Sequence, residues 1–176
     1  MSVFKTTFSR ALKVIPSDNC NVPSPNLLIS SVSTSQGTNL LIDTTAKFYV
    51  NVTSEADNSQ RREYKVNVGD VVYNYSTGKA ATIVEVVSDT TLLLNADNIV
   101  LTSEPYFIYQ EGPQTGLGNQ GCYLYISNIS LIGDLNINTI GGDEISFTNI
   151  PTGLLPIQVK KVFQLGTNLT DITALW

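Results

Sequence analysis

Histidine is absent from this chain of 176 residues, and charged side chains are scarce. Without histidine the chain lacks the commonest general base, the usual partner of a catalytic serine or cysteine, and the commonest ligand of transition metals. Charged residues make up 14% of the sequence, against about 25% in a typical globular protein. The polar surface must therefore consist mainly of Asn, Ser, Thr and Gln, a composition that favours strands and turns and is common in proteins that assemble.

The features of membrane insertion and secretion are also missing. No apolar run approaches the length of about 18 residues that a transmembrane helix requires, so we expect no membrane partner. The N-terminal MSVFKTTFSRALKV has no apolar run of a signal peptide, which indicates synthesis as a soluble protein in a cytoplasm. The two cysteines, Cys20 and Cys122, could form a disulfide, but the missing signal favours reduced thiols.

Negative charge is concentrated in the middle of the chain. Segment 33–111 carries five basic and ten acidic side chains, a net charge of −5, whereas the two flanking segments together hold five of each sign. Nucleic-acid binding needs a basic surface that releases counterions from phosphates. Neither part of the chain offers one, so the sequence predicts no nucleic-acid partner.

Alternation of apolar and polar residues predicts strands in the C-terminal third. Residues 135–139 alternate as a half-buried strand requires, the glycine pair within 140–143 reverses the chain, and 145–147 resume the alternation. After a further turn, a third strand slips in phase at Lys160-Lys161, as at a β-bulge. We therefore predict a hairpin followed by a third antiparallel strand, a folding unit without any arrangement for chemistry.

Two stretches of the sequence resemble a single protein family. They are ALKVIPSDNCNVP near the N-terminus and GDLNINTIGGDEISFTNIPTGLLPIQVKKV, which is followed by the terminal GTNLTDITALW. In their glycines, prolines and final aromatic residue they are similar to the head-spike base proteins of gene transfer agents and to related small virion proteins of tailed phages. The resemblance covers about half of the chain and skips the middle. It implies an all-β structural protein of the virion, assembled in the host cytoplasm.

The middle of the chain is predicted to be an inserted β module between two polar links, 31–39 and 112–121. Residues 1–32 and 112–176 would then form an antiparallel, sandwich- or barrel-like domain, and 33–111 a second, acidic, barrel-like module in one of its loops. The alternative is one larger sandwich. Short strands are expected in the module at 40–42, 47–52, 64–68, 71–75, 80–87, 91–95 and 106–109, with a loop at 53–62.

No motif in the sequence predicts an enzyme, a cofactor or a metal site. Residues 116–121 match G-x-G-x-x-G, but a dinucleotide site needs a helix after the glycines, and a strand is predicted there. The acidic residues lack the spacing of a calcium loop. We therefore expect a non-enzymatic protein without catalytic, cofactor-binding or metal-binding residues.

Apolar residues near the termini and turns are the predicted assembly contacts. The N-terminal residues are either a frayed end or an arm that orders against a neighbouring subunit. Trp176, the sole tryptophan and the last residue, should be buried in its own domain or in a neighbour. The residues expected at the interface of a symmetric homo-oligomer, a trimer or a pentamer, are Phe4, Phe8, Leu154, Leu155, Pro156 and Trp176.

The sequence thus favours a head decoration or spike-base protein that contacts other virion proteins, such as the major capsid protein or tail and neck proteins. The alternative is a tail-, neck- or baseplate-associated protein whose insert binds a host surface glycan. Aromatic residues are enriched at interfaces and in glycan sites, although they are also ordinary residues of β-sheets. The predicted ligand face of the insert consists of Tyr73, Tyr75, Tyr106 and Tyr109.

Overall fold

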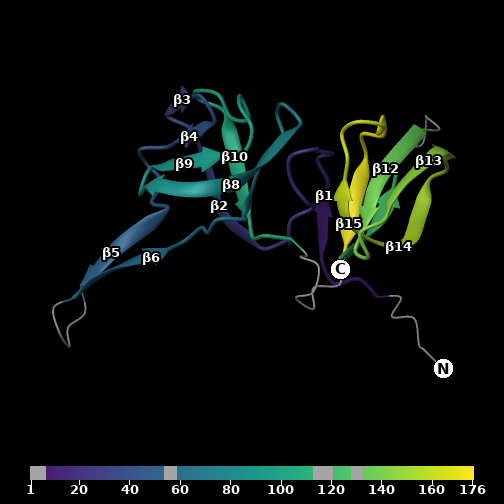
Figure 1. Ribbon diagram of the computed structural model, residues 1–176, viewed down its shortest axis with the longest axis horizontal. Helices are drawn as coiled ribbons and strands as arrows, with labels where there is room; N and C mark the ends of the chain where they lie inside the picture. Colours follow the sequence, from purple (N-terminus) through teal and green to yellow (C-terminus); the bar gives the residue numbers. More distant parts are fainter. Residues whose placement is uncertain (1–6, 54–58, 113–120, 128–132) are drawn as a thin grey trace. The chain divides into compact units, whose positions relative to one another are not determined.

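The computed structural model describes residues 7–53, 59–112, 121–127 and 133–176 (Figure 1). Every regular element in these ranges is a β-strand and every strand pairing is antiparallel, so the predicted all-β fold class is confirmed. The same ranges contain no helix long and apolar enough to cross a membrane. Phe4 and most of the G-x-G-x-x-G motif lie outside the described residues.

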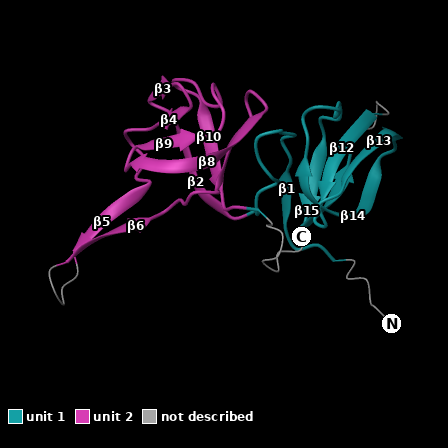
Figure 2. Ribbon diagram, viewed as in Figure 1, with its two compact units in different colours: residues 1–25, 112–176 teal, residues 26–111 magenta. Residues whose placement is uncertain are grey.

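The chain divides into two compact units (Figure 2). Unit 1 comprises Met1–Pro25 and Gly112–Trp176, and unit 2 comprises Asn26–Glu111. This division differs at one boundary from the predicted one, which assigned residues up to 32 to the flanking domain. Residues 27–32 instead form a strand that pairs within unit 2. The polar residues 33–39 that follow this strand resemble a link between domains, so the sequence did not reveal that the strand belongs to unit 2.

Unit 1 is a six-stranded antiparallel sheet in the order β1-β15-β11-β14-β12-β13. The long strand β14 pairs with β11 through Leu155 and with β12 through Val162, so it belongs to both halves of the sheet. The inward side chains of the two halves form one core cluster, as in a sandwich. The strands are β1 (Ala11–Lys13), β11 (Cys122–Ile126), β12 (Gly133–Thr139), β13 (Glu144–Ile150), β14 (Gly153–Val162) and β15 (Ile172–Leu175).

The predicted hairpin and bulge are confirmed in β12, β13 and β14. Residues of β12 alternate between buried and half-buried along the strand's whole length, and the Gly142 N–H donates to the Thr139 carbonyl at 3.0 Å to close the turn. Gly142 has a φ of 101°, a value that glycine adopts without steric strain. The pairing of β12 with β14 skips Lys160, which is the extra residue of the predicted bulge.

Unit 2 contains a seven-stranded sheet in the order β2-β10-β7-β8-β9-β4-β3. Its first and last strands are consecutive in the chain, and the Ser33 and Thr34 amides between them donate to the carbonyls of Glu104 and Ile42. One bent strand therefore closes the sheet into a barrel. The strands are β2 (Leu27–Val32), β3 (Ser35–Gly37), β4 (Leu40–Ile42), β7 (Val71–Asn74), β8 (Lys79–Ser88), β9 (Thr91–Leu94) and β10 (Pro105–Tyr109).

A two-stranded ribbon made of β5 (Tyr49–Thr53) and β6 (Gln60–Tyr64) extends from the barrel of unit 2 (Figure 1). Its strands pair with each other in a sheet of their own. The predicted loop at 53–62 extends too far, because residues 60–62 already belong to β6, which begins at Gln60. Every residue of β6 is exposed, so this strand has no buried face and no alternation by which the sequence could reveal it.

Burial of the alternating residues in β12 should dominate the stability of unit 1. Ile137 is fully buried in the core cluster, so Ile137→Ala should lower the free energy of unfolding of unit 1 by about 2–5 kcal/mol. Chemical denaturation followed by circular dichroism measures this change. The matched control is Leu165→Ala, because Leu165 is 79% exposed, and its effect should stay within about 0.5 kcal/mol. Equal effects of the two substitutions would contradict the described core.

Candidate assembly surfaces

The outer face of the β11–β14–β15 region in unit 1 is rich in large apolar side chains. Along β11, Leu124 is buried, whereas Tyr123 and Tyr125 point to the opposite side. Tyr125 lies directly across from Leu154 of β14, and the two side chains are 44% and 47% exposed. We call this surface the outer sheet face; it consists of Phe8, Tyr123, Tyr125, Leu154, Pro156 and Leu175.

Phe8 joins the outer sheet face through an aromatic contact. Its ring centroid lies 5.7 Å from that of Tyr123, with the two planes tilted by 56°. The neighbouring Ser9 amide donates to the Trp176 carbonyl at 2.8 Å, so this part of the N-terminal arm is fixed along the last strand. From residue 8 onward, the described arm is therefore attached to its own unit rather than frayed.

One of the predicted interface residues is buried inside unit 1, and another is half-buried against the same core. Leu155 is buried in the core cluster because it follows Leu154 and points to the opposite side of β14. Trp176 is half-buried against the same core, and its backbone N–H donates to the Arg10 carbonyl at 3.0 Å. Of the six predicted residues, the structure thus brings Phe8, Leu154 and Pro156 to one surface, and Phe4 lies outside the described residues.

The predicted tyrosine face of unit 2 is not an exposed surface. Tyr73, Tyr106 and Tyr109 are buried. Tyr73 and Tyr109 pack edge to face with centroids 5.6 Å apart, and the Tyr75 hydroxyl donates to the Tyr109 hydroxyl at 3.3 Å. Burial and this hydrogen bond raise the pKa of Tyr75. Because buried aromatic rings contribute large apolar area, Tyr73, Tyr106 and Tyr109 stabilise the interior of unit 2, whereas Tyr75 is half-buried beside them.

Tyr106 takes part in a buried polar cluster that the sequence did not reveal. Its hydroxyl donates to the Asp43 carboxylate at 2.8 Å, as do the Ser31 hydroxyl at 2.6 Å and the Thr45 hydroxyl at 2.6 Å. The Thr45 and Ala46 amides donate to the same carboxylate. Burial by itself would raise the pKa of Asp43, but these donors lower it to about 2. The cluster connects β2 and β10 to the turn after β4.

A shallow hollow of about 400 Å³ lies beside this cluster. It is lined by residues 28–31 and 45–47 and by Lys65. Hydroxyls and two lysines give it a polar lining, but Lys47 already forms an ion pair with Asp89 at 2.6 Å. The hollow is open to solvent, unlike the enclosed sites that hold small ligands. Its geometry is therefore a weak basis for a binding site.

The two cysteines are free and buried, in agreement with the predicted reduced thiols. Burial raises the pKa of Cys20 to about 11 and that of Cys122 to about 12. Neutral, inaccessible thiols are poor nucleophiles and poor metal ligands. Within the described ranges no group of three or more Cys, Asp or Glu side chains is arranged to hold a metal ion.

Comparison with known proteins provides no relative from which a function could be transferred. No family model, curated protein or solved structure matches the chain. The outer sheet face of unit 1 and the ribbon of unit 2 are therefore the surfaces from which function must be argued.

The Asp43 cluster should make the stability of unit 2 sensitive to acid. The pKa of Asp43 in the folded state, about 2, lies below its unfolded value of about 3.9, so its stabilisation is present above pH 4 and is lost as the pH falls towards 2. Asp43→Asn should cost about 1–3 kcal/mol at pH 7, and the difference from wild type should narrow below pH 4. Thermal unfolding across this pH range measures both effects.

The control for this prediction is Asp89→Asn, which removes an exposed carboxylate that forms a surface ion pair with Lys47. Its effect at pH 7 should stay below about 1 kcal/mol. A difference between Asp43→Asn and wild type that stays constant from pH 7 to pH 2 would show that the Asp43 carboxylate does not have the depressed pKa.

Proposed function

We propose that the chain is a non-enzymatic structural protein of a bacteriophage virion. In this proposal it is a head decoration or spike-base protein that assembles as a symmetric homo-oligomer through unit 1 and contacts other virion proteins. The observation that carries the proposal is the outer sheet face, where Tyr125 and Leu154 are exposed side by side. Contiguous apolar surface of this kind is typical of protein interfaces.

The sequence resemblance and the outer sheet face fall in the same unit. The stretch that resembles spike-base proteins forms β12, β13 and β14, and the N-terminal stretch contains β1. Leu154 and Pro156, which belong to this stretch, lie on the outer sheet face. This coincidence supports a role in assembly for unit 1, with unit 2 as an added module.

Strand edges offer unit 1 a second means of association. The sheet ends at β1 on one side and at β13 on the other. An edge strand has unpaired backbone N–H and C=O groups that can pair with a neighbouring subunit. Closed rotational symmetry would repeat the same contact around the oligomer, which fits a trimer or a pentamer.

The alternative role as a glycan-binding adhesin of the tail, neck or baseplate has weaker support. It depended on an aromatic ligand face in the insert, and Tyr73, Tyr106 and Tyr109 are buried. An enzymatic role is disfavoured by the absence of histidine and by the buried thiols of Cys20 and Cys122. Assembly requires neither group.

The proposal is tested on phage particles purified by density gradient from cells that carry the gene of this chain. We expect the chain in DNA-filled particles, at a fixed copy number relative to the major capsid protein, by quantitative mass spectrometry. Leu154→Glu should reduce incorporation of the chain into particles by at least tenfold. Assembly would bury the new carboxylate in the interface without a partner of opposite charge. Val68→Glu places the same charge at an exposed position of unit 2 and is the matched control.

Absence of the chain from purified particles would refute the virion role. Normal incorporation of the Leu154→Glu variant would retain that role but show that the outer sheet face is not the assembly surface. Circular dichroism of both purified variants verifies that any loss of incorporation is not a loss of folding.

A further inference from the structure

The ribbon of unit 2 presents an aromatic and cationic face. Tyr49 lies directly opposite Tyr64, with ring centroids 5.4 Å apart. The Arg62 guanidinium lies 4.8 Å from the centroid of the Tyr49 ring. Side chains of the two strands alternate between faces, so these three lie on one side, whereas Arg61 and its ion-pair partner Glu63 lie on the other. We call Tyr49, Arg62 and Tyr64 the aromatic ribbon face.

This face lacks a partner of opposite charge within the described residues. Arg61 is neutralised by Glu63 at 2.8 Å, but no ion pair with Arg62 is found there. A two-stranded ribbon by itself is at best marginally stable in water, because each strand pairs on one side only. Packing of one face against another surface would provide the missing burial.

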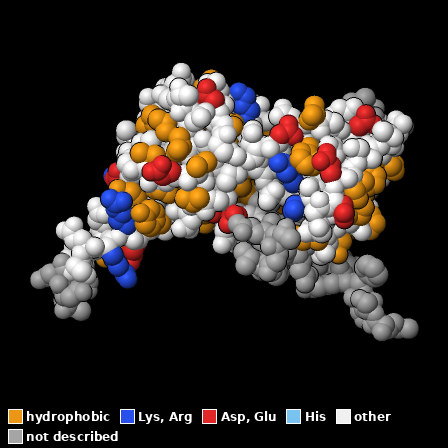
Figure 3. Space-filling view, viewed as in Figure 1, with side chains coloured by type: hydrophobic (Ala, Val, Ile, Leu, Met, Phe, Trp, Pro, Cys, Tyr) orange, Lys and Arg blue, Asp and Glu red, His pale blue; other side chains and the backbone are white. Residues whose placement is uncertain are grey.

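Charge distinguishes the aromatic ribbon face from the barrel of unit 2. The face carries the cation Arg62 and no acidic side chain, and Arg61 and Glu63 neutralise each other on the opposite side. Outside residues 49–64 the unit holds three basic and seven acidic side chains, a net charge of −4. Figure 3 shows basic side chains on the ribbon, and acidic as well as basic ones on the barrel surface. The aromatic ribbon face of one copy is therefore complementary in charge to the barrel of another.

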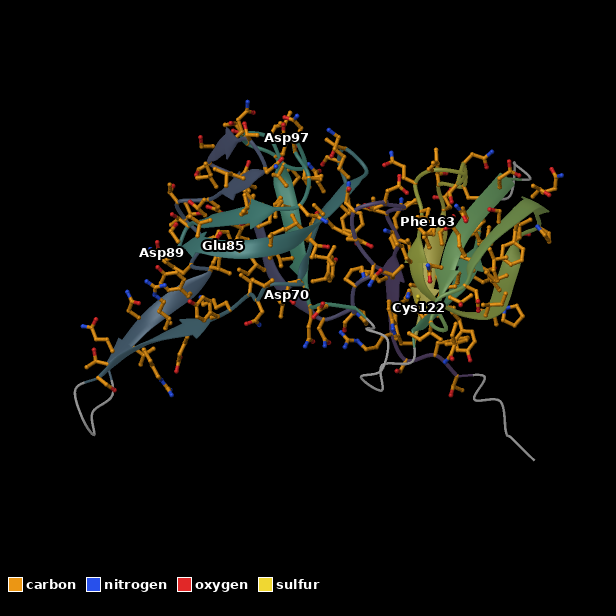
Figure 4. The ribbon with its side chains drawn as sticks, viewed as in Figure 1. Asp70, Glu85, Asp89, Asp97, Cys122 and Phe163 are labelled. Carbon is orange, nitrogen blue, oxygen red and sulfur yellow. The ribbon has the colours of Figure 1, made fainter. Side chains whose placement is uncertain are left out.

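Strand β8 of the barrel offers a matching surface. Its pairing with β9 has two bulges, which leave Val84 and Val87 without partners in the ladder. These valines are 46% and 50% exposed, and the exposed Glu85 lies between them in the chain. Figure 4 shows Glu85 on this strand, and no ion pair of Glu85 is found within the described residues. We call Val84, Glu85 and Val87 the bulged β8 surface.

We propose that the aromatic ribbon face of one copy binds the bulged β8 surface of a second copy. Arg62 would pair with Glu85, and the rings of Tyr49 and Tyr64 would cover Val84 and Val87. The partner is a second copy of this chain because the two surfaces complement each other in charge and in apolar character. The inference rests on the proposed homo-oligomer and adds a contact between neighbouring copies to the one made by unit 1.

Cross-linking between two variants tests this contact directly. Arg62→Cys and Glu85→Cys chains are purified separately, mixed, and oxidised mildly. We expect a disulfide-linked dimer that contains one chain of each kind, identified by mass spectrometry. Cys20 and Cys122 do not compete, because both are buried. The matched control mixes Arg62→Cys with Asp97→Cys, since Asp97 is an exposed acidic residue in the β9–β10 connection.

Charge reversal provides a second measurement. Arg62→Glu should weaken self-association at least tenfold in sedimentation equilibrium, and Arg62→Glu combined with Glu85→Arg should restore it. Lys79→Glu makes the same change of charge on the barrel and should leave association within twofold of wild type. Restoration by the combined variant would not follow from a merely structural role of either residue.

Four results would overturn the proposal. Equal cross-linking of Glu85→Cys and Asp97→Cys would show that the contact is not specific. An oligomer that is unchanged by Arg62→Glu would refute the ribbon contact but leave the proposed oligomer of unit 1 intact, whereas a wild-type chain that stays monomeric would refute both. Binding of duplex DNA by the wild type that is lost in Arg62→Glu would assign the ribbon to nucleic acid instead.

Discussion

The large sheets of unit 1 and unit 2 must each bury one face, and both units are built around that constraint. In unit 1 the bulge at Lys160 lets β14 pair with β11 at one end and with β12 at the other, so one continuous sheet encloses its own core. In unit 2 the first and last strands of the sheet, β2 and β3, are continuous through the bend at Ser33 and Thr34. The sheet is therefore closed into a barrel without a free edge strand.

We assign function to the surfaces that lie outside these buried sheet faces. The outer sheet face of unit 1 leaves the paired Tyr125 and Leu154 exposed, and the ribbon of unit 2 has no core of its own. Both surfaces are therefore suited to burial between subunits, and neither requires a catalytic group.

Sequence patterns predicted the elements that have one buried face. Alternation over 135–139, the glycine turn and the slip at Lys160 all follow from local spacing, and each is confirmed. The ribbon could not be found in this way, because β6 has no buried face. The polar cluster was hidden for another reason, since Tyr106 and Asp43 are 63 residues apart and only the closed barrel brings them together.

Alternation along the strands and burial explain where the structure places the predicted site residues. Leu154 and Leu155 are equally apolar, but successive residues of a strand point to opposite faces, and only Leu154 reaches the surface. Apolar character alone does not reveal which of the two is inside. Tyrosines are ambiguous for the same reason, because a ring suits a core as well as an interface, and the surrounding strands bury three of the four.

The central claim, that unit 1 carries the assembly surface, is tested most directly by light scattering on the full chain beside a variant that lacks residues 26–111. We predict a discrete trimer or pentamer in both, with weaker association in the deletion variant because the ribbon contact is lost. A monomer at every concentration in the full chain would contradict the account. An oligomer that disappears entirely on deletion of 26–111, while circular dichroism shows unit 1 still folded, would place the assembly surface in unit 2.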